Sequence, residues 1–508
     1  MSDTASAACG PCRTDSRMTE IALPPHLAAQ AKAGPPGLSD ALRIWWAGVS
    51  AVTPQRLFAS EVRLEKRKLI VSEESFELRG LRRIVVVGAG KASAGMAAAL
   101  YENCLKRCEG SMAVTGWINA PAGSFRPGEA GPIHLHAARP AGINEPTAAA
   151  VAGTEAIMRL VEQCTANDLC IVLLSGGGSA MLAAPIDGVT LGDKQQVARK
   201  IAAAGGNIQQ LNIVRRALSR VKGGGLASRC GARQIVSLII SDVLGDPLET
   251  IASGPTVSSA VVRPQAALAV LEQLGLMDDS DMKNVVSVLS QLDRAATSEA
   301  PRTRRAVPIS NIVLANNATA VDAAGVKAVE LGYRYIMQAA RTLEADVAQL
   351  AHTVARAIEQ LSGEPQVDCW ISGGEPTVKL PPPALCGRGG RNQQLALLSL
   401  LELSQRGWPQ EQSKFPSPVL FLSAGTDGED GPTPAAGAWI DDHTLQHLVT
   451  LGLDPNDFAR RADAYSLFDR LGSLVISEPT GTNVCDLRIA IKVDSSKSPG
   501  AVRTLELK

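Results

Sequence analysis

Strand-length apolar runs alternate with helical stretches over most of the chain. Three such runs, at 84–87, 169–174 and 235–240, each end in glycines or an acidic residue, and a helical stretch follows each one. Buried strands that alternate with helices are typical of a parallel sheet whose faces are covered by helices. The pattern therefore predicts an α/β domain in the N-terminal half of the chain.

This pattern is interrupted between residues 258 and 308, where helical segments lead into the polar, basic stretch TSEAPRTRRAVPIS. A second alternating block follows, with strand-like runs in SNIVLAN, VDCWISGG, PVLFLSAGTDG and DLRIAIKV. The first residues carry no such pattern and end in the linker-like AGPPGLSD. We therefore expect a disordered tail over 1–38, an N-terminal α/β domain over 39–304 and a second α/β domain over 305–508.

Glycine-rich turns follow several of the predicted strands. The carboxyl ends of parallel strands line the ligand crevice, and glycine lets the backbone bring its N–H groups close to an anion. The repeated turns indicate a polyanionic ligand between two domains, although glycines that merely end strands are the alternative in a chain with 46 of them. The candidate phosphate-binding residues are Gly88, Gly90, Ser175, Gly176, Gly177, Gly178, Ser179, Gly373, Gly374 and Glu375.

The first of these turns, GAGKAS, departs from the two common nucleotide-binding motifs. A Walker A loop needs glycine four residues before its Gly-Lys pair, and Val86 stands there. A dinucleotide-binding G-x-G-x-x-G turn needs a third glycine where this chain has Ser93. Lys91 closes the turn, so it is placed to neutralise phosphate oxygens or to do nothing more than face solvent.

Cations cluster near two of the glycine turns. The string NIVRRALSRVKGGGLA places Arg215, Arg216, Arg220 and Lys222 on a predicted helix that ends at three glycines. Taken alone, such a string also fits a solvated basic face. Arg391 opens a predicted helix in GRGGRNQQLAL. A cation there opposes the helix dipole by up to about 1 kcal/mol, so an anionic ligand would explain its position.

Acidic residues follow two other strands. Asp242 and Asp246 come after the run at 235–240, and Asp427 follows PVLFLSAG. Carboxylates on loops suit Mg²⁺, which keeps several waters and shares phosphate oxygens. Asp242, Asp246 and Asp427 are therefore candidate metal ligands, with helix caps and turn formers as the alternative.

Composition narrows the class of protein. The 508 residues are 45% hydrophobic, and 50 basic side chains balance 50 acidic ones. A nucleic-acid or membrane-surface protein would usually carry a basic excess, and no apolar run is long enough to cross a membrane. The ten cysteines form no paired framework, so we expect reduced thiols in a cytoplasmic protein, with mitochondria as the alternative location. The Cys-Gly-Pro-Cys string at 9–12 lies in the predicted tail and lacks the strand–helix setting of a redox motif.

Eight ordered strings resemble class II glycerate kinase, the family whose chains end in a MOFRL domain. They are VVGAGKAS, LLSGGGSA, NIVRRALSRVKGGGLA, SLIISDVLGDPLETIASGPT, SGGEPTV, GRGGRNQQLAL, LSAGTDGEDGPT and PTGTNVCDLRI. The resemblance covers roughly residues 40 to 493. The resemblance implies a Rossmann-like N-terminal domain, a C-terminal MOFRL domain and an active site between them. It also implies transfer of the ATP γ-phosphoryl group to D-glycerate with Mg²⁺ or another divalent cation.

The resemblance also implies roles for particular residues. Lys91 and Arg391 match the family's best catalytic candidates, Asp242 is either a base or a metal ligand, and Lys222 joins the nucleotide-binding residues. Three positions depart from the family: Arg139 stands for a usual histidine, Cys485 precedes Asp486, and RADAYSLF replaces an Asn-Asp-Ser-Tyr stretch.

We expect a glycerate kinase whose product is 2-phosphoglycerate, with 3-phosphoglycerate as the alternative product. Two other functions stay open: an NAD(P)H-linked hydroxypyruvate reductase and a catalytically silent nucleotide-binding protein. The missing G-x-G-x-x-G turn speaks against the first, and the retained Lys91, Asp242 and Arg391 speak against the second. The expected partners are D-glycerate and ATP, with no nucleic acid and no membrane, and a homo-oligomer is possible.

Overall fold

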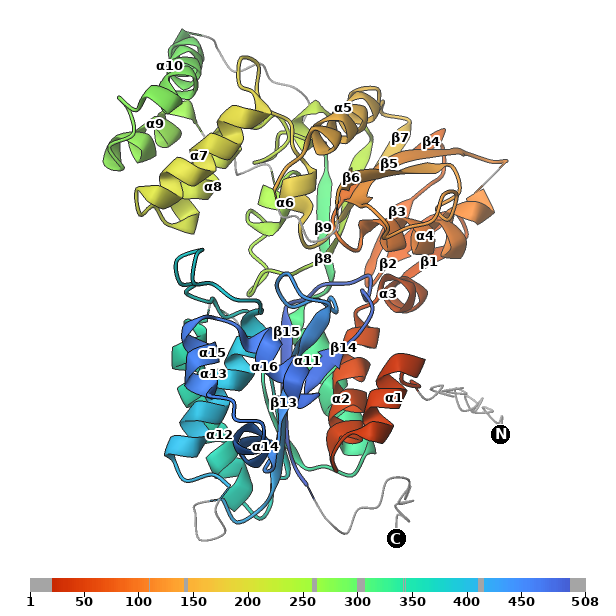
Figure 1. Ribbon diagram of the computed structural model, residues 1–508. Coiled ribbons are helices and arrows are strands. Elements are labelled where there is room, and N and C mark those ends of the chain that lie inside the picture. Colours follow the sequence, from red (N-terminus) through yellow and green to blue (C-terminus); the bar gives the residue numbers. More distant parts are fainter. Residues whose placement is uncertain are drawn as a thin grey trace, which may run out of the picture.

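The computed structural model describes residues 21–493 apart from 109, 141–144, 258–262, 299–306, 341, 343 and 410–414. Two α/β units lie one above the other, and in each sheet the ends of the strands face the other unit (Figure 1). The predicted α/β fold with two domains is confirmed. The Cys-Gly-Pro-Cys string lies outside the described residues.

The first unit is built on a six-stranded sheet with the order β6-β5-β4-β7-β8-β9, in which every neighbouring pair is parallel. The chain adds β5 and β6 on one side of β4 and later adds β7, β8 and β9 on the other. The point where the order reverses therefore lies between β4 and β7. The strands are β4 (Arg83–Ala89), β5 (Ala113–Pro121), β6 (Ile133–Arg139), β7 (Asp168–Leu174), β8 (Gln234–Ile240) and β9 (Ile309–Ala315).

Both faces of this sheet are buried, because side chains of alternate parity point to opposite sides of a strand. Ile84 and Val86 of β4 join one apolar cluster, whereas Val85 and Val87 join another. The continuous apolar runs of the sequence follow from this two-sided burial. The covering helices include α4 (Ser93–Asn103), α5 (Ala148–Glu162) and the short α6 (Gly178–Met181).

A group of four helices extends from the first unit and packs around an apolar cluster of its own. The helices are α7 (Leu191–Ala203), α8 (Ile208–Ala217), α9 (Pro264–Gln273) and α10 (Lys283–Ser298). The predicted helix that carried all four cations from Arg215 to Lys222 is wrong, because α8 ends at Ala217. Arg220 and Lys222 follow in a loop, and Gly223 and Gly224 after them take left-handed φ values that a helix cannot use.

The second unit is built on a mixed sheet with the order β10-β11-β15-β12-β13-β14. Only β10 and β11 are parallel, and the other pairs are antiparallel. The strands are β10 (Tyr335–Gln338), β11 (Cys369–Gly374), β12 (Val419–Gly425), β13 (Ala435–Ile440), β14 (Leu474–Ile476) and β15 (Asp486–Lys492).

Helices cover both faces of the second sheet. Leu420 and Leu422 of β12 join the cluster that contains residues of α2 and α11, whereas Val419 and Phe421 join the cluster of α12 and α13. The helices are α2 (Leu38–Ala51), α11 (Asn317–Glu330), α12 (Val347–Gly363), α13 (Arg391–Gln405), α14 (Thr444–Thr450), α15 (Pro455–Arg460) and α16 (Ala464–Leu471). Between α2 and β4 the chain forms α3 (Pro54–Glu61) and a small antiparallel sheet of β1 (Val62–Glu65), β2 (Lys68–Val71) and β3 (Glu74–Glu77).

The two units do not divide the chain at residue 304. Strand β9 lies beyond that point, yet Ile309 pairs with Ile235 of β8 in the first sheet. Helix α2 lies in the expected N-terminal domain, yet it packs against α11, β12 and β15 of the second unit. The second unit therefore takes one segment from the beginning of the chain and another from residue 317 onwards.

The predicted tail over 1–38 is wrong from Pro25, where α1 (Pro25–Ala33) begins. Leu27 is 0% exposed in the core of the second unit. The side chain of Gln30 donates to the backbone oxygen of Ile476 at 2.6 Å and accepts from its N–H at 3.1 Å. The sequence did not predict this helix, because it is short and only Leu27 among its residues is buried.

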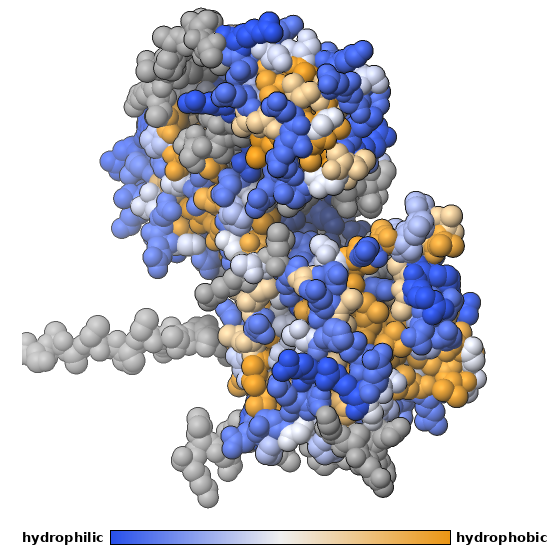
Figure 2. All heavy atoms as spheres, turned by 90° about the vertical axis from the view of Figure 1, so that its left-hand side faces the viewer, coloured by the Kyte–Doolittle hydropathy of each residue, from blue (hydrophilic) through white to orange (hydrophobic). Residues whose placement is uncertain are grey.

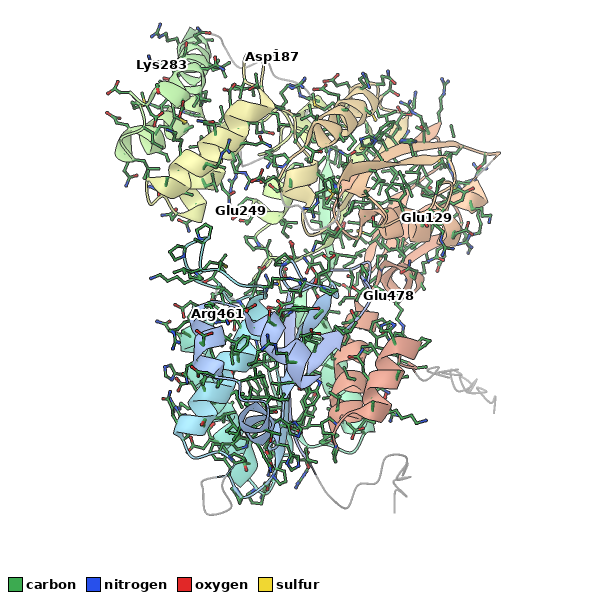
Figure 3. All side chains as sticks on the ribbon, in the orientation of Figure 1. Glu129, Asp187, Glu249, Lys283, Arg461 and Glu478 are labelled. Atoms are coloured by element: carbon green, nitrogen blue, oxygen red, sulfur yellow. The ribbon has the colours of Figure 1, made fainter. Side chains whose placement is uncertain are left out.

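The space-filling view shows polar and apolar side chains mixed over the surface and a hollow between the two units (Figure 2). Glu249 of the first unit and Arg461 of the second lie on edges that face each other (Figure 3). Among the described helices, none has the length and apolar character needed to cross a membrane.

The packing of α1 predicts the effect of two substitutions. Leu27→Ala removes a fully buried side chain, so the free energy of unfolding should fall by about 2–5 kcal/mol. Lys32→Ala on the exposed side of the same helix should change it by less than about 0.5 kcal/mol. Urea denaturation followed by circular dichroism measures both values. Equal midpoints for the two variants would contradict a packed α1.

Candidate active site

The first two glycine turns lie side by side at the switch point of the parallel sheet. The N–H of Lys91 donates to the carbonyl oxygen of Gly176 at 2.8 Å, and the N–H of Ser175 donates to that of Ala89 at 3.3 Å. Gly90 has a φ of 149°, and a Cβ at this position would overlap Ser175. The backbone thus explains why glycine is needed here, and the predicted turns are brought together.

The other two turns lie at the strand ends of the second sheet that face the first unit. Gly374 ends β11, Gly425 ends β12, and both pair with Asp486 of β15. Because β15 runs antiparallel to both neighbours, its first residue lies at the edge where they end. Acidic site residues were predicted only after strands, and Asp486 is the first residue of one, so the sequence predicted no role for it. The available signal was an acidic residue directly before the apolar run of DLRIAIKV.

Glycine has a packing reason at the end of β11. A Cβ on Gly373 would overlap the side chain of Asn317, and a Cβ on Gly374 would overlap that of Glu344. Glu344 also forms a two-point ion pair with the buried Arg488. The turn therefore positions Glu375 by close packing, and phosphate binding by its glycines stays a prediction.

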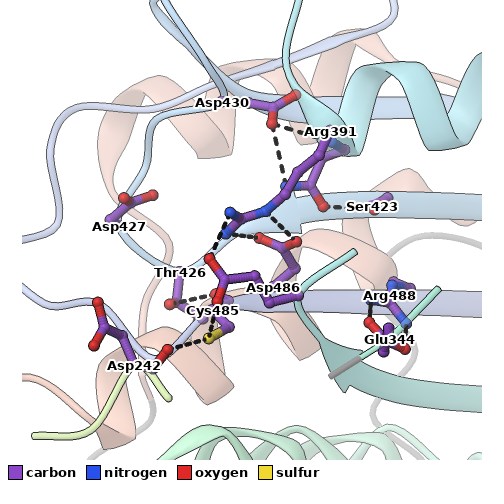
Figure 4. A network of polar contacts seen from close by, with 12 residues as sticks. Asp242, Glu344, Arg391, Ser423, Thr426, Asp427, Asp430, Cys485, Asp486 and Arg488 are labelled. Atoms are coloured by element: carbon purple, nitrogen blue, oxygen red, sulfur yellow. Dashed lines mark hydrogen bonds and ion pairs between the residues drawn. The ribbon is translucent and has the colours of Figure 1, made fainter. Parts of the chain in front are cut away.

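Arg391 is held by two carboxylates. Its Nε and Nη2 donate to Asp486 at 2.7 and 3.0 Å, and its Nη1 donates to Glu375 at 2.7 Å (Figure 4). Asp486 is nearly inaccessible, with 1% of its side chain exposed. Burial lowers the pKa of Arg391, but Asp486 and Glu375 outweigh it and hold the pKa well above the usual value. The guanidinium is thus fixed and charged.

Asp430 stabilises the helix that Arg391 begins. It accepts hydrogen bonds from the N–H groups of Asn392 at 3.0 Å and Gln393 at 2.8 Å, in the first turn of α13. Burial raises the pKa of Asp430 to about 7, and Asp486 adds to the rise. This carboxylate caps free N–H groups from a distant loop, which offsets the unfavourable position of Arg391 at a helix N-terminus.

Lys91 connects the two units. Its Nζ donates to Asp427 Oδ2 at 2.7 Å and to Glu429 Oε2 at 3.3 Å, both of which follow β12 of the second unit. Burial lowers the pKa of Lys91, but the attraction and hydrogen bonds of the two carboxylates exceed that effect and raise it. The lysine at the end of the first glycine turn is therefore an interdomain contact.

Asp242 follows β8, and its backbone oxygen accepts from Cys485 Sγ, beside Asp486, at 3.0 Å. Burial and the charge of Glu375 raise the pKa of Asp242 to about 6, and the charges of Lys91 and Arg391 oppose this rise. Its Oδ2 accepts from Asn483 Nδ2 at 3.3 Å, and a Cβ on Gly176 would overlap its carboxylate. The structure therefore brings the three predicted catalytic residues into one region.

The predicted metal ligands are brought together only in part. Asp246 accepts from Asn316 at 2.5 Å beside the start of α11, and Asp427 is held by Lys91. Within the described ranges, the one group of three possible ligand side chains whose donor atoms lie within 4.8 Å of one another is a set of buried thiols, Cys164, Cys170 and Cys230. The three aspartates thus form no metal cage by themselves.

The second glycine turn leads into a basic region. Lys222 is 4% exposed and donates to the carbonyl oxygen and hydroxyl of Ser179 at 2.9 and 2.7 Å. Arg139, the departure from the family pattern, is 3% exposed, and its guanidinium lies 3.0 Å from where a Cβ on Gly177 would be. Arg139 therefore lies beside the turn. From the sequence, this residue was known only as a replacement for the family's usual histidine.

Two family models match the chain. One, described as "Domain of unknown function (DUF4147)", matches residues 40–290, and the MOFRL family matches residues 368–486. The crystal structure of a glycerate kinase from Thermotoga maritima superposes with a TM-score of 0.71 at 30% identity and covers 90% of this chain and 99% of its own. A Pyrococcus horikoshii protein superposes with a TM-score of 0.69 at 27% identity over the same shares.

Relatives with assigned names span nearly the whole chain. The glycerate kinases of Bos taurus and Homo sapiens are each 37% identical to it, over 501 and 504 residues, and the matches cover 88–89% of this chain and 91–92% of theirs. The D-glycerate 2-kinase of Thermotoga maritima is 32% identical over 425 residues, 83% of this chain and 93% of its own. The chain therefore belongs to the glycerate kinases of the MOFRL family, as its ordered motifs indicated.

Proposed function

We propose that this enzyme transfers the γ-phosphoryl group of ATP to D-glycerate and releases 2-phosphoglycerate. The observation that carries the proposal is the meeting of three residues where the two sheets face each other: Gly176 contacts both Lys91 and Asp242, and Cys485 contacts both Asp242 and the Glu375 that holds Arg391. Each unit supplies one cation. The position of the transfer is supported by the Thermotoga and Pyrococcus relatives, whose names specify a 2-kinase.

Lys91 and Arg391 would stabilise the phosphoryl group in transit. Phosphoryl transfer needs positioning and charge neutralisation more than covalent chemistry, so two fixed cations supply most of what is required. Each cation is held by two carboxylates, which fix its geometry without substrate. The side chains are therefore preorganised, and the phosphoryl oxygens need only enter their field.

Asp242 would accept the proton of the attacking glycerate hydroxyl. A base must be ionised at the working pH and still basic enough to take a proton, and a pKa of about 6 meets both needs near neutrality. Asn483 and the neighbouring Gly176 fix the orientation of the carboxylate.

The surroundings of the two cations fit a divalent metal ion. Their combined charge of two is exceeded by the carboxylates of Asp242, Glu375, Asp427, Glu429 and Asp486. We keep Asp242 as the base and assign Asp427 as the residue that would hold Mg²⁺ together with phosphate oxygens, whereas Asp246 is committed to Asn316. The ion would neutralise phosphate charge, which this acidic edge would otherwise repel.

The two turns at the switch point would hold the phosphates of ATP. The first is the segment 88–91 and the second is 175–178, and their backbones are hydrogen-bonded to each other. Positive φ values at Gly90 and Gly177 expose the backbone there in a way that side chains would prevent.

The proposal predicts how two cation variants behave. With ATP, Mg²⁺ and D-glycerate, the wild-type enzyme should form 2-phosphoglycerate, detected by ³¹P NMR, and should not oxidise NADH with hydroxypyruvate. Lys91→Ala and Arg391→Ala should each lower kcat on the order of 10³-fold, because a transition-state cation is lost. Lys106→Ala is the matched control, since Lys106 is an exposed lysine paired with Glu102 outside the site.

The control should keep kcat within about twofold, because an exposed ion pair contributes little free energy to the fold and this one lies outside the site. Formation of 3-phosphoglycerate would overturn the assigned product. A Lys91→Ala enzyme with near-normal kcat and circular dichroism would show that the lysine only connects the units.

A second prediction concerns the glycine beside Asp242. In Gly176→Ala, the new methyl group overlaps the Asp242 carboxylate and the Asn483 amide, so both must move. Displacement of a catalytic group by about 1 Å can cost about 10²-fold in rate, and kcat should fall by that order while the fold is kept. Gly363→Ala is the control, because nothing lies within 4 Å of a Cβ there. Equal kcat for the two variants would show that Asp242 does not need its present position.

A further inference from the structure

Two buried lysines and a half-buried arginine converge beside the second glycine turn. Lys222 Nζ and Arg215 Nη2 both donate to the hydroxyl of Ser179, at 2.7 and 3.2 Å. Lys194, which is 8% exposed, donates to the carbonyl oxygen of Leu218 at 3.1 Å. They come from α7, from α8 and from the loop that follows it, and the last two contact Ser179 of α6. We call Lys194, Arg215, Lys222 and Ser179 the cation pocket.

No carboxylate neutralises this pocket within the described part of the chain. Neither Lys194, Arg215 nor Lys222 takes part in an ion pair there. By contrast, Arg220 of the same sequence string pairs with Glu155. Burial of a charge without a partner is strongly unfavourable, so this arrangement is costly unless an anion enters.

The pKa values of the two lysines also indicate that positive charge is unfavourable in the pocket. Burial, together with repulsion from Arg215, lowers the pKa of Lys194 to about 7. Burial also lowers the pKa of Lys222 well below its usual value, with added repulsion from Arg215, Lys194 and Arg216. The cations repel one another, and an anion bound among them would offset that repulsion.

A strained segment lies against the pocket. Ala252 and Ser253 have φ values of 49° and 64°, a left-handed conformation that is unfavourable for both residue types. The hydroxyl of Ser253 lies 2.9 Å from that of Ser179. Strain of this kind is retained where the surrounding structure requires it, often at ligand sites.

The pocket also continues the turn at the switch point. Ser179 directly follows Gly176, Gly177 and Gly178, which border the Asp242 and Lys91 region. A ligand that reaches from that region into the pocket must carry several negative charges along its length. Glycerate carries one carboxylate, whereas the polyphosphate of a nucleotide carries several negative charges in a row.

We propose that the cation pocket binds the non-transferred phosphates of the nucleotide, with the γ-phosphate directed toward Lys91 and Arg391. This inference rests on the proposed kinase function for the direction of the nucleotide. It places the polyphosphate in the first unit and leaves the acidic edge of the second unit to the metal ion and D-glycerate.

The experiment uses Lys222→Met, Arg215→Met and Lys194→Met in the full chain, with Arg199→Met on the exposed side of α7 as the control. Isothermal titration calorimetry measures the affinities for inorganic tripolyphosphate, MgATP and D-glycerate. Each pocket variant should bind tripolyphosphate and MgATP at least tenfold more weakly and D-glycerate within about twofold of wild type. The control should match wild type for all three.

Thermal unfolding without ligand separates binding from folding. The pocket variants should melt at or above the wild-type temperature, because an uncompensated buried charge is removed. Unchanged tripolyphosphate affinity, or weakening confined to D-glycerate, would overturn the proposal. Tripolyphosphate binding needs no turnover, so a chain that binds it through the pocket but forms no phosphoglycerate would contradict the kinase function and not the pocket.

Discussion

The ion pairs of Lys91 with Asp427 and Glu429 join the two units at the site. The lysine leaves the end of β4, and the carboxylates leave the end of β12, so one contact brings the functional edges of both sheets together. Arg391 is fixed in the same way by Asp486 and Glu375. The geometry of the site thus depends on cations whose charge is already balanced before substrate arrives, which preorganises them at little cost in desolvation.

Charge is distributed unevenly around this meeting point. Carboxylates exceed cations near Asp242, whereas the pocket around Ser179 holds cations with no carboxylate partner in the described part of the chain. An acidic region suits a metal ion, and a basic pocket suits phosphates. A metal–nucleotide complex carries both kinds of group. Its metal ion would bind in the acidic region and its phosphates in the basic pocket, on either side of the same glycine turn.

The sequence was sufficient for the parts that obey local rules. Continuous apolar runs identified β4, β7 and β8 of the parallel sheet, and the glycine turns identified the strand ends that carry Lys91 and Asp242. It was insufficient where distant segments decide the outcome. Asp486 lies at the start of an antiparallel strand, α1 is stabilised by contacts with Ile476, and the register of β9 on β8 places it in the first sheet. None of these pairings leaves a periodic pattern, since each depends on residues far away in the chain.

In the proposed mechanism, Lys91 of one unit and Arg391 of the other act on the same phosphoryl group. The decisive experiment is a double-mutant cycle on kcat, with Lys91→Ala, Arg391→Ala and the combined variant measured under saturating MgATP and D-glycerate. Groups that act as a unit are non-additive, so the combined variant should lose far less than the product of the two single losses. A combined loss equal to that product would show that the two cations act independently and would contradict the account.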